Sequence, residues 1–322
     1  MLIKGDKNSI ELAVDLLQKG EIIVIPTETV YGLAGDATNS VAIEKIYRAK
    51  NRPAYNPLIA HVCDIVMAQQ YCDIDKLSMY LMQKFWPGAL SLVLPLCTDS
   101  KINDKALAGL ATVALRCPQG IFNEIISAFK RPIVAPSANI SGRISTTNAE
   151  AVAQNLKNKV SLIIDSGACA IGIESTIIKV QANKLHILRP GAISLDMLRL
   201  ALDEFIDFDV EIVDTASCKI ESPGMLSSHY APNAFVRLNA TEIYTGEALL
   251  GFGKEGCKNA KNAVASLNLS INANLEEAAH NLFNFLHLLD KNNVKTIAVQ
   301  AIPNEGLGVA INDRLIRAAF RK

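Results

Sequence analysis

The chain has 322 residues, more than one ordinary hydrophobic core holds, and a domain size of about 100–200 residues predicts two domains. Apolar residues make up 50% of it and charged residues 20%, which is typical of a globular protein that folds in water. Its 32 lysines and arginines balance 32 acidic residues. A protein that holds nucleic acid by itself usually carries a basic excess, so we expect no stable nucleic-acid binding, although a local anion site is not excluded.

The cysteines and the apolar stretches indicate a reduced, cytoplasmic protein. The 7 cysteines are odd in number and form no C-x-x-C pair, which argues against a zinc site or a disulfide framework. The N-terminus lacks the apolar core of a signal peptide. The most apolar stretch, residues 89–96, is far shorter than the about 20 residues that cross a bilayer, so we expect no membrane association.

The first predicted elements are a helix and a buried strand that leads into polar residues. Asn8 and Glu11 fit a helix N-cap and its N3 partner, and Gly20 ends the helix. Residues 22–25 are a continuous apolar run of strand length. The polar residues 27–29 follow at once, and such residues at the end of a buried strand commonly form a site.

Helices and strands continue to about residue 206. Helices are predicted over residues 41–50, 78–86 and 149–156 and from Ser194 to about Phe205, and strands over residues 92–94, 113–115, 133–135, 162–164, 177–180 and 185–188. Thr147 or Asn148 fits the N-cap of the helix over residues 149–156. This pattern predicts an α/β domain over residues 1–206.

The remaining chain is predicted to be a linker and a small second domain. Periodicity is lost after residue 206, so residues 207–233 are assigned to a linker. In residues 234–322, strands alternate with helices, which predicts a small parallel α/β domain. The strands are expected over residues 235–238, 248–252 and 296–299, and the helices over residues 275–289 and 313–320.

A basic pair stands where a helix meets a loop restricted by proline, because Lys50 and Arg52 directly precede Pro53. A lysine, as a compact charge, and an arginine, as a bidentate fork, together suit a polyphosphate. The alternative is a basic helix end that complements the helix macrodipole. This motif alone favours the alternative.

A loop of small polar residues follows the strand over residues 133–135. It contains Ser137, Asn139 and Ser141 before Gly142, and such loops let backbone N–H groups and hydroxyls approach an anion closely. It is not a Walker A loop, because the required pattern of glycines and lysine is absent from the chain. An ordinary turn or a helix N-cap explains this loop equally well.

Two arginines, Arg116 and Arg189, end apolar strands. An arginine is seldom buried unless it is paired, so each one either pairs with a carboxylate or faces an anionic ligand. Residues 174–176 add a Glu-Ser-Thr run just before another strand. Polar residues at the ends of several strands in one domain favour a single shared binding site, whose opening we call the mouth. The residues alone therefore predict binding of a small molecule that bears phosphate.

Taken together and in this order, the motifs resemble the YrdC-like threonylcarbamoyl-AMP synthase family. The likeness runs through residues 26–33 (PTETVYGL), Lys50-x-Arg52, residues 56–59 (NPLI), residues 85–88 (FWPG), Ser137-x-Asn139, residues 174–176 (EST) and residues 188–192 (LRPGA). Residues 222–225 and 229–232 resemble the linker of the long form, and residues 306–319 resemble the end of its C-terminal domain. The resemblance implies a twisted, open mixed sheet with a concave site and a smaller Rossmann-like C-terminal domain.

The resemblance also implies a reaction and a set of site residues. The family joins L-threonine, bicarbonate and ATP into threonylcarbamoyl-AMP, with pyrophosphate and water released, for threonylcarbamoyladenosine modification of tRNA next to the anticodon. A threonylcarbamoyl transferase complex would consume the product. Threonine would contact Thr29, His61, Arg116, Ser137 and Ser175. ATP would contact Arg52, Asn56, Thr112, Asn139, Thr147, Arg189 and Tyr230. The catalytic residues would be Lys50, Arg52, Ser137 and Asn139. Mg²⁺ would accompany the ATP phosphates, through protein ligands that the sequence does not identify.

The linker departs from the family's usual pattern, and two other functions compete with the synthase. Residues 226–228 are Leu-Ser-Ser where the family commonly has a basic-aromatic stretch, so a phosphate contact by that stretch is not carried over. One alternative is a binding module that keeps the concave surface without the activity, which the neutral charge disfavours. The other is a carbamoyl-transfer enzyme that adenylates carbamoyl phosphate. The length of this chain and its lack of C-x-x-C pairs argue against that.

Overall fold

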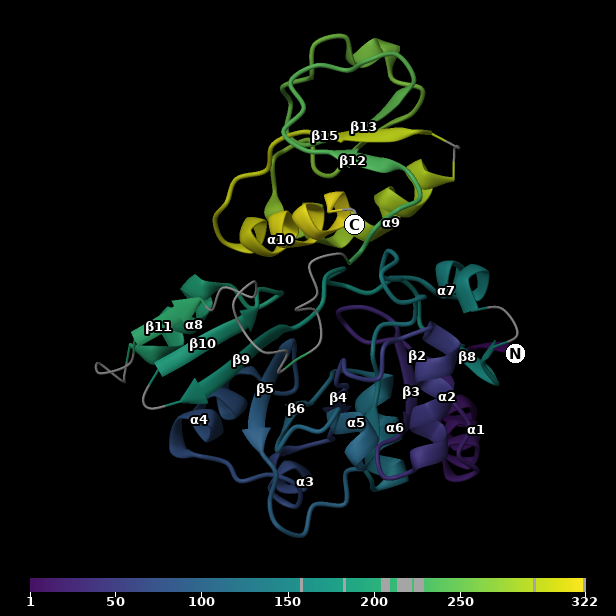
Figure 1. The fold of residues 1–322 in the computed structure, drawn as a ribbon, viewed down its shortest axis with the longest axis vertical. Coiled ribbons are helices and arrows are strands. Elements are labelled where there is room, and N and C mark those ends of the chain that lie inside the picture. Colours follow the sequence, from purple (N-terminus) through teal and green to yellow (C-terminus); the bar gives the residue numbers. More distant parts are fainter. Residues whose placement is uncertain are drawn as a thin grey trace.

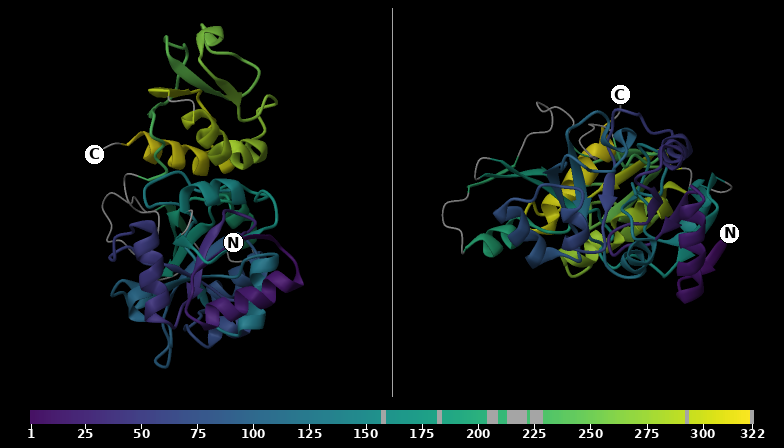
Figure 2. Two further views of the ribbon diagram at one scale, coloured as in Figure 1. Left: turned by 90° about the vertical axis from the view of Figure 1, so that its right-hand side faces the viewer. Right: turned by 90° about the horizontal axis from the view of Figure 1, so that it is seen from below.

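The computed structural model describes residues 1–156, 159–181, 184–203, 209–212, 222, 229–291 and 294–320. It has two α/β domains, and the C-terminal one, drawn in green and yellow, lies above the N-terminal one in Figure 1. Helices α9 (Leu275–Asp290) and α10 (Leu307–Ala319) lie between the C-terminal sheet and the N-terminal domain in Figures 1 and 2. The second domain is thus placed to touch the first through its helices.

In the described residues, the N-terminal domain is built on an open sheet of 11 strands. Their order across the sheet is β1 (Leu2–Lys4), β8 (Leu162–Asp165), β2 (Ile23–Ile25), β3 (Gly32–Asp36), β7 (Ile133–Val134), β4 (Ile59–His61), β6 (Thr112–Arg116), β5 (Leu90–Pro95), β9 (Thr176–Gln181), β10 (Lys184–Arg189) and β11 (Asp209–Ile212). Strands β4 and β6 are parallel, whereas β5 and β6 are antiparallel. The expected open mixed sheet is confirmed.

Helices cover this sheet on both faces, which explains why its central strands are continuous apolar runs. They are α1 (Lys7–Gln18), α2 (Ser40–Lys50), α3 (Ile65–Gln69), α4 (Lys76–Phe85), α5 (Asp104–Leu107), α6 (Ile121–Phe129), α7 (Ala149–Leu156) and α8 (Leu195–Leu202). Successive side chains of a strand point to opposite faces. Accordingly, Ile23 and Ile25 belong to the core shared with α1 and α6, whereas Val24 belongs to the core shared with α2 and α4.

The C-terminal domain has a smaller, parallel sheet, as expected. Its strand order is β12 (Phe235–Arg237), β15 (Thr296–Val299), β13 (Glu247–Gly251) and β14 (Ser266–Asn268), and a short 3₁₀ helix covers Ala260–Asn262. Its apolar core is formed with α9 and α10 and also includes Val30, Ile144 and Ile173 of the N-terminal domain. One apolar cluster therefore joins the two domains.

Several helix starts differ from the prediction. The cap of α1 is Asp6 and not Asn8, because the Asp6 carboxylate accepts the Ser9 N–H at 2.8 Å and the Ser9 hydroxyl accepts the Asp6 N–H at 2.9 Å. Helix α4 likewise begins earlier than predicted, after an aspartate cap at Asp75. Helix α10 begins at Leu307 rather than at residue 313, and the glycines around that start hide its helical character in the sequence.

Some strands were not predicted, and one of them lies in the supposed linker. Strands β1, β3, β4 and β14 are short and have little periodic signal of their own. Strand β11 falls within residues 207–233, yet it pairs in parallel with β10, so the large sheet extends beyond residue 206. Residues 204–208, 213–221 and 223–228, including the Leu-Ser-Ser departure, lie outside the described residues.

Candidate active site

One cavity collects the polar strand ends of the N-terminal domain, as the sequence predicted. Its lining includes the predicted site residues Arg52, His61, Arg116, Ser137, Ser175, Arg189 and Tyr230. His61 ends β4 and Arg116 ends β6, and these two residues are register partners in the parallel pair. Arg189 ends β10. The carboxyl ends of three strands thus bring these side chains to one place.

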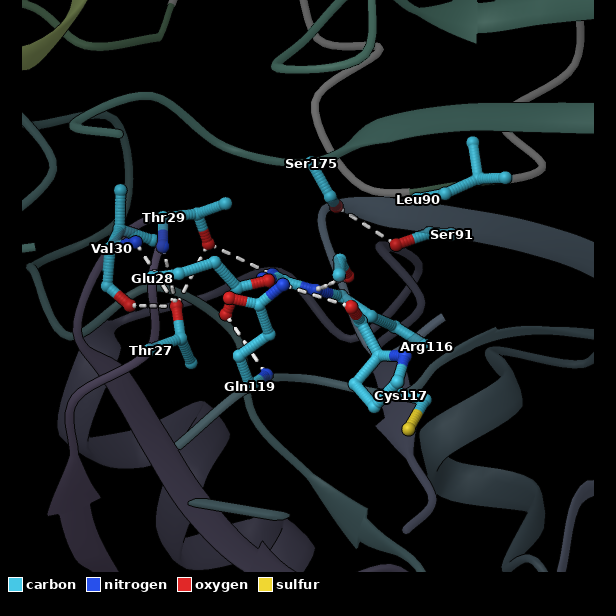
Figure 3. Close-up of polar contacts among 12 residues, drawn as sticks. Thr27, Glu28, Thr29, Val30, Leu90, Ser91, Arg116, Cys117, Gln119 and Ser175 are labelled. Atoms are coloured by element: carbon cyan, nitrogen blue, oxygen red, sulfur yellow. Dashed lines mark hydrogen bonds and ion pairs between the residues drawn. The ribbon is translucent and has the colours of Figure 1, made fainter. Parts of the chain in front are cut away.

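Arg116, which lines the cavity, belongs to a charge-balanced group that we call the Arg116–Glu28 corner, formed by Arg116, Glu28 and Thr29 (Figure 3). Arg116 Nη2 lies 2.6 Å from Glu28 Oε1, and Nη1 donates to the Thr29 hydroxyl at 2.9 Å. Arg116 Nε donates to the Gly88 carbonyl at 3.1 Å. Of the two alternatives for this arginine, pairing with a carboxylate is confirmed. Because both terminal nitrogens carry a second N–H, donors remain for a ligand.

A second group, which we call the cationic wall, consists of Lys50, Arg52 and Arg189. Arg52 and Arg189 line the cavity, whereas Lys50 lies outside the lining and donates to the carbonyl of Ser137, which lines it. Lys50 ends α2 with 1% of its surface exposed, so a basic residue does stand at this helix end, but it is buried. Its Nζ donates to the carbonyls of Ser137 and Asn139, the latter at 2.6 Å. Burial and the nearby charge of Arg52 hold the pKa of Lys50 well below its usual value. An anion beside it would therefore stabilise its charged form.

The two arginines of the cationic wall are held by neutral oxygens. Arg52 Nη2 donates to Asn56 Oδ1 and to the Pro57 carbonyl, both at 2.7 Å. Arg189 donates to the Ser175 carbonyl from Nη2 at 2.8 Å and from Nε at 3.1 Å. Burial lowers the pKa of Arg52 to about 10 and also lowers the pKa of Arg189. Among the described residues, no carboxylate forms an ion pair with any cation of this wall.

Two histidines line the same cavity, and both are buried. His61 Nδ1 lies 3.3 Å from the Ile133 carbonyl oxygen, and burial together with Arg116 lowers the pKa of His61 to about 3. Burial and the surrounding cations lower the pKa of His229 as well, and its buried Nδ1 has no hydrogen-bond partner. Both imidazoles are therefore neutral near pH 7.

The remaining predicted site residues divide into supporting residues and outlying residues. Asn139 Nδ2 donates to the Ile140 carbonyl at 2.9 Å and to the Arg143 carbonyl at 2.8 Å, while its buried Oδ1 has no partner. Thr112 begins β6, at the opposite end from Arg116, and does not line the cavity. Thr147 is buried outside the lining, and Asn148, not Thr147, accepts the Ala151 N–H at 2.8 Å as a helix cap. Contact of Thr112 and Thr147 with ATP stays a prediction.

Sequence reasoning missed several residues that build the cavity. Glu28 lies within the polar residues 27–29 that the sequence singled out. Its partner Arg116 is distant along the chain, so the sequence did not predict this ion pair. Ser91 Oγ lies 2.8 Å from Ser175 Oγ, and it is hidden in an apolar strand. Glu174 lines the cavity and pairs with Arg314 of the second domain. The sequence did single out residues 174–176, but it assigned no role to Glu174 itself.

Other sequence expectations concern cysteines, metals and membranes. The described cysteines are free, and Cys218 lies outside the described residues. In the part of the chain that the structure describes, no three His, Cys, Asp or Glu side chains are grouped to hold a metal ion. Each described helix is too short or too polar to cross a membrane.

The fold and the cavity define the class: a two-domain α/β protein whose large open sheet carries a cation-rich site at its strand ends. Comparisons with known proteins are consistent with this class. Residues 15–191 match the Sua5/YciO/YrdC family model, described as "Telomere recombination", and residues 193–320 match "Threonylcarbamoyl-AMP synthase, C-terminal domain". The threonylcarbamoyl-AMP synthase of Bacillus subtilis is 36% identical over 95% of this chain and 92% of its own length. That of Pyrococcus abyssi is 35% identical over 96% and 94%.

Solved structures give the same result. The crystal structure of P. abyssi Sua5 complexed with L-threonine is similar with a TM-score of 0.88 and 31% identity, over 99% of this chain and 96% of that one. Escherichia coli YciO shares the N-terminal fold, with a TM-score of 0.53 and 22% identity over 60% of this chain and 94% of its own. The chain belongs to the Sua5/YrdC family of threonylcarbamoyl-AMP synthases, in its long two-domain form, and is an enzyme.

Proposed function

We propose that this chain joins L-threonine, bicarbonate and ATP into threonylcarbamoyl-AMP, with pyrophosphate and water as the other products. The observation that carries the proposal is a single cavity lined both by Arg52 and Arg189 of the cationic wall and by Arg116 of the Arg116–Glu28 corner. The wall suits a triphosphate because its cations have no carboxylate partner among the described residues. The relatives that match nearly the whole chain are threonylcarbamoyl-AMP synthases, which supports the same reaction.

The Arg116–Glu28 corner suits an amino acid. The remaining Arg116 donors fit the threonine carboxylate as a charge-assisted pair. The hydroxyls of Ser137 and Ser175, which line the same cavity, fit the threonine hydroxyl. His61 beside them is neutral, so it adds no positive charge where the amine must lose a proton to become nucleophilic.

The proposed chemistry needs little more than position and charge neutralisation. The threonine nitrogen attacks the carbon of bicarbonate or of the CO₂ in equilibrium with it, loses a proton and becomes a carbamate, and bicarbonate loses water. A carbamate oxygen then attacks the α-phosphorus of ATP, and the bond to the bridging oxygen of the leaving pyrophosphate breaks. Lys50, Arg52 and Arg189 would stabilise the negative charge on the phosphates, which is the main requirement of such transfers.

Mg²⁺ is proposed to enter with the nucleotide. Magnesium is usually held by substrate phosphates and one or two protein oxygens, with water completing its shell. Asn139 Oδ1 fits this requirement, because it is buried and has no hydrogen-bond partner, and the backbone carbonyl of the same residue accepts from Lys50 of the cationic wall. When bound, the ion would supply further charge neutralisation to the triphosphate.

The product would serve tRNA modification. Threonylcarbamoyl-AMP is a mixed anhydride of a carbamate and a phosphate, so an amine acceptor can take its threonylcarbamoyl group. We infer that a threonylcarbamoyl transferase complex uses it on tRNA in the cytoplasm. The chain's net charge of zero agrees with a synthase that hands over a small product and does not bind tRNA stably.

The test is pyrophosphate release from ATP and Mg²⁺, with threonine and bicarbonate each present or omitted. We expect release only when both are present, together with threonylcarbamoyl-AMP in the mass spectrum. No release from a folded protein that binds tRNA tightly would support the binding module instead. Release with carbamoyl phosphate in place of threonine and bicarbonate would support the carbamoyl-transfer enzyme.

A further inference from the structure

A single carboxylate stands among the cations of the cavity. Of the described residues that line it, Glu174 is the acidic one, whereas Arg52, Arg116 and Arg189 are basic. Glu174 is buried, with 6% of its surface exposed. A free carboxylate at this place would repel the phosphates of a nucleotide and would attract the cations that the phosphates need.

The negative charge of Glu174 is paired with an arginine of the C-terminal domain. Its Oε1 accepts the Ser145 hydroxyl at 2.5 Å, and its Oε2 lies 3.1 Å from Arg314 Nε. Arg314 belongs to α10 of the C-terminal domain and is completely buried. Its Nη1 donates to the Pro190 carbonyl at 2.5 Å and pairs with Asp313 at 2.8 Å. Arg314 therefore holds both Glu174 and the residue that directly follows Arg189.

The segment around Glu174 is closely packed, both against its own domain and against the C-terminal domain. A Cβ placed on Gly191 would lie 2.4 Å from Thr176 N and 2.5 Å from the Glu174 carbonyl oxygen. A Cβ placed on Gly172 would lie 2.5 Å from His280 Cα of α9. Tyr230 stacks on Phe283 of α9 with ring centroids 5.4 Å apart, and the Arg314 guanidinium carbon also lies 5.4 Å from the Tyr230 ring. The segment that carries Glu174 is thus fixed directly against the second domain.

We propose that Arg314 is a positioning residue that binds Glu174 and so leaves the cations of the wall free for the triphosphate of ATP. The C-terminal domain would in this way set the charge of the nucleotide site without lining it. The inference rests on the proposed function for its substrate. Burial opposes the charge of Glu174, but Arg314, Arg189 and Ser145 together lower its pKa, so the carboxylate is ionised and requires a partner.

A competing account gives Arg314 direct contact with the nucleotide. Its Nη2 is buried and has no hydrogen-bond partner, so it could bind a phosphate itself. The two accounts differ in what happens when Glu174 loses its charge. If Arg314 acts through Glu174, it becomes dispensable once residue 174 is neutral. If Arg314 binds ATP itself, it remains necessary.

The experiment compares Arg314→Gln, Glu174→Gln and the double variant in the full chain, by ATP affinity in calorimetry and by KM values from pyrophosphate release. We expect Arg314→Gln to weaken ATP binding at least about tenfold and to change the threonine KM less than about threefold. Glu174→Gln is the reference for the double variant, which should bind ATP within about threefold of it. Arg317→Gln is the matched control, since Arg317 pairs at 2.8 Å with Asp313 on the same helix rather than with Glu174.

The outcome is decisive even if Arg314→Gln alone fails to fold, because the double variant can then be compared with Glu174→Gln. A difference of less than about threefold in ATP affinity between these two supports the proposal. A loss of about tenfold or more on adding Arg314→Gln to the Glu174→Gln variant would overturn it, because Arg314 would then act on ATP binding by a route other than Glu174. Failure of the proposed function is seen separately, as a parent that binds ATP but releases no pyrophosphate with threonine and bicarbonate.

Discussion

Arg116 of the Arg116–Glu28 corner and the two arginines of the cationic wall line the same cavity, but the positive charge of the two groups is balanced differently. At the corner, the guanidinium of Arg116 is paired with a carboxylate at 2.6 Å in the same domain. At the wall, Lys50 and Arg189 are held by backbone carbonyls, and Arg52 by carbonyls and an amide oxygen. The positive charge of the corner is therefore balanced by a carboxylate before any ligand binds. The positive charge of the wall is not.

This difference in charge balance indicates which substrate suits each region. Burying a cation without an anion is costly, and burial accordingly lowers the pKa values of Lys50, Arg52 and Arg189. A triphosphate supplies the missing negative charge at the wall. At the corner, a zwitterionic amino acid adds no net charge, so a pre-balanced arginine can orient its carboxylate without attracting a second polyanion.

The largest effect is expected from removing a charge of the wall. Lys50→Met keeps the length of the side chain but removes its charge and leaves the Ser137 and Asn139 carbonyls without their donor. We expect kcat/KM to fall about 100-fold or more, as measured by pyrophosphate release. Lys45→Met is the control, because Lys45 lies on the same helix and pairs with Glu21 at the surface; it should change the rate less than about twofold. A Lys50→Met enzyme with near-parental activity would remove Lys50 from the catalytic residues.

A smaller effect is expected from unbalancing the corner. Glu28→Gln keeps the shape of the side chain but leaves the Arg116 guanidinium without its ionic partner. We expect the threonine KM to rise about tenfold and the ATP KM to change less than about threefold. Steady-state kinetics with each substrate varied in turn measures both values. Equal changes in the two KM values would mean that the corner and the wall are not separate binding regions.

The smallest effect concerns His61 and is seen in stability rather than rate. Its pKa is lowered to about 3 in the folded chain from an ordinary value of 6.5, so the unfolded chain takes up a proton first as the pH falls. The contribution of the neutral His61 side chain to the free energy of unfolding is thus fully present above about pH 6.5. It is lost progressively as the pH falls toward 3. Between about pH 6 and 4, the free energy of unfolding should fall up to about 1.4 kcal/mol per pH unit more steeply in the parent than in His61→Gln. Parallel slopes in urea unfolding would show that His61 is not held neutral.

Much of the fold could be predicted from the sequence where the pattern is local and long. The helices α2 and α9 and the strands β5, β6, β9 and β10 follow periodic or continuous apolar runs. The predicted mouth was also found, because Arg116 and Arg189 end strands of one sheet and the carboxyl ends of parallel strands meet at one edge.

The rest depends on contacts that join distant parts of the chain. Strands β3 and β4 have 5 and 3 residues and are held mainly by their neighbours. The partner of Arg116 is Glu28 and the partner of Glu174 is Arg314, and no local pattern identifies either pair. Sequence reasoning could state that a strand-end arginine either pairs or binds an anion. Only the tertiary structure shows that Arg116 is paired and that Arg189 forms no ion pair among the described residues.

The division between the corner and the wall is tested most directly by calorimetry on the parent, Arg52→Gln and Arg116→Gln, with ATP and L-threonine titrated separately. We predict that Arg52→Gln weakens ATP binding about tenfold or more and threonine binding less than about threefold, and that Arg116→Gln does the reverse. If each variant weakens both ligands to the same extent, the two regions do not bind different substrates and the account is contradicted.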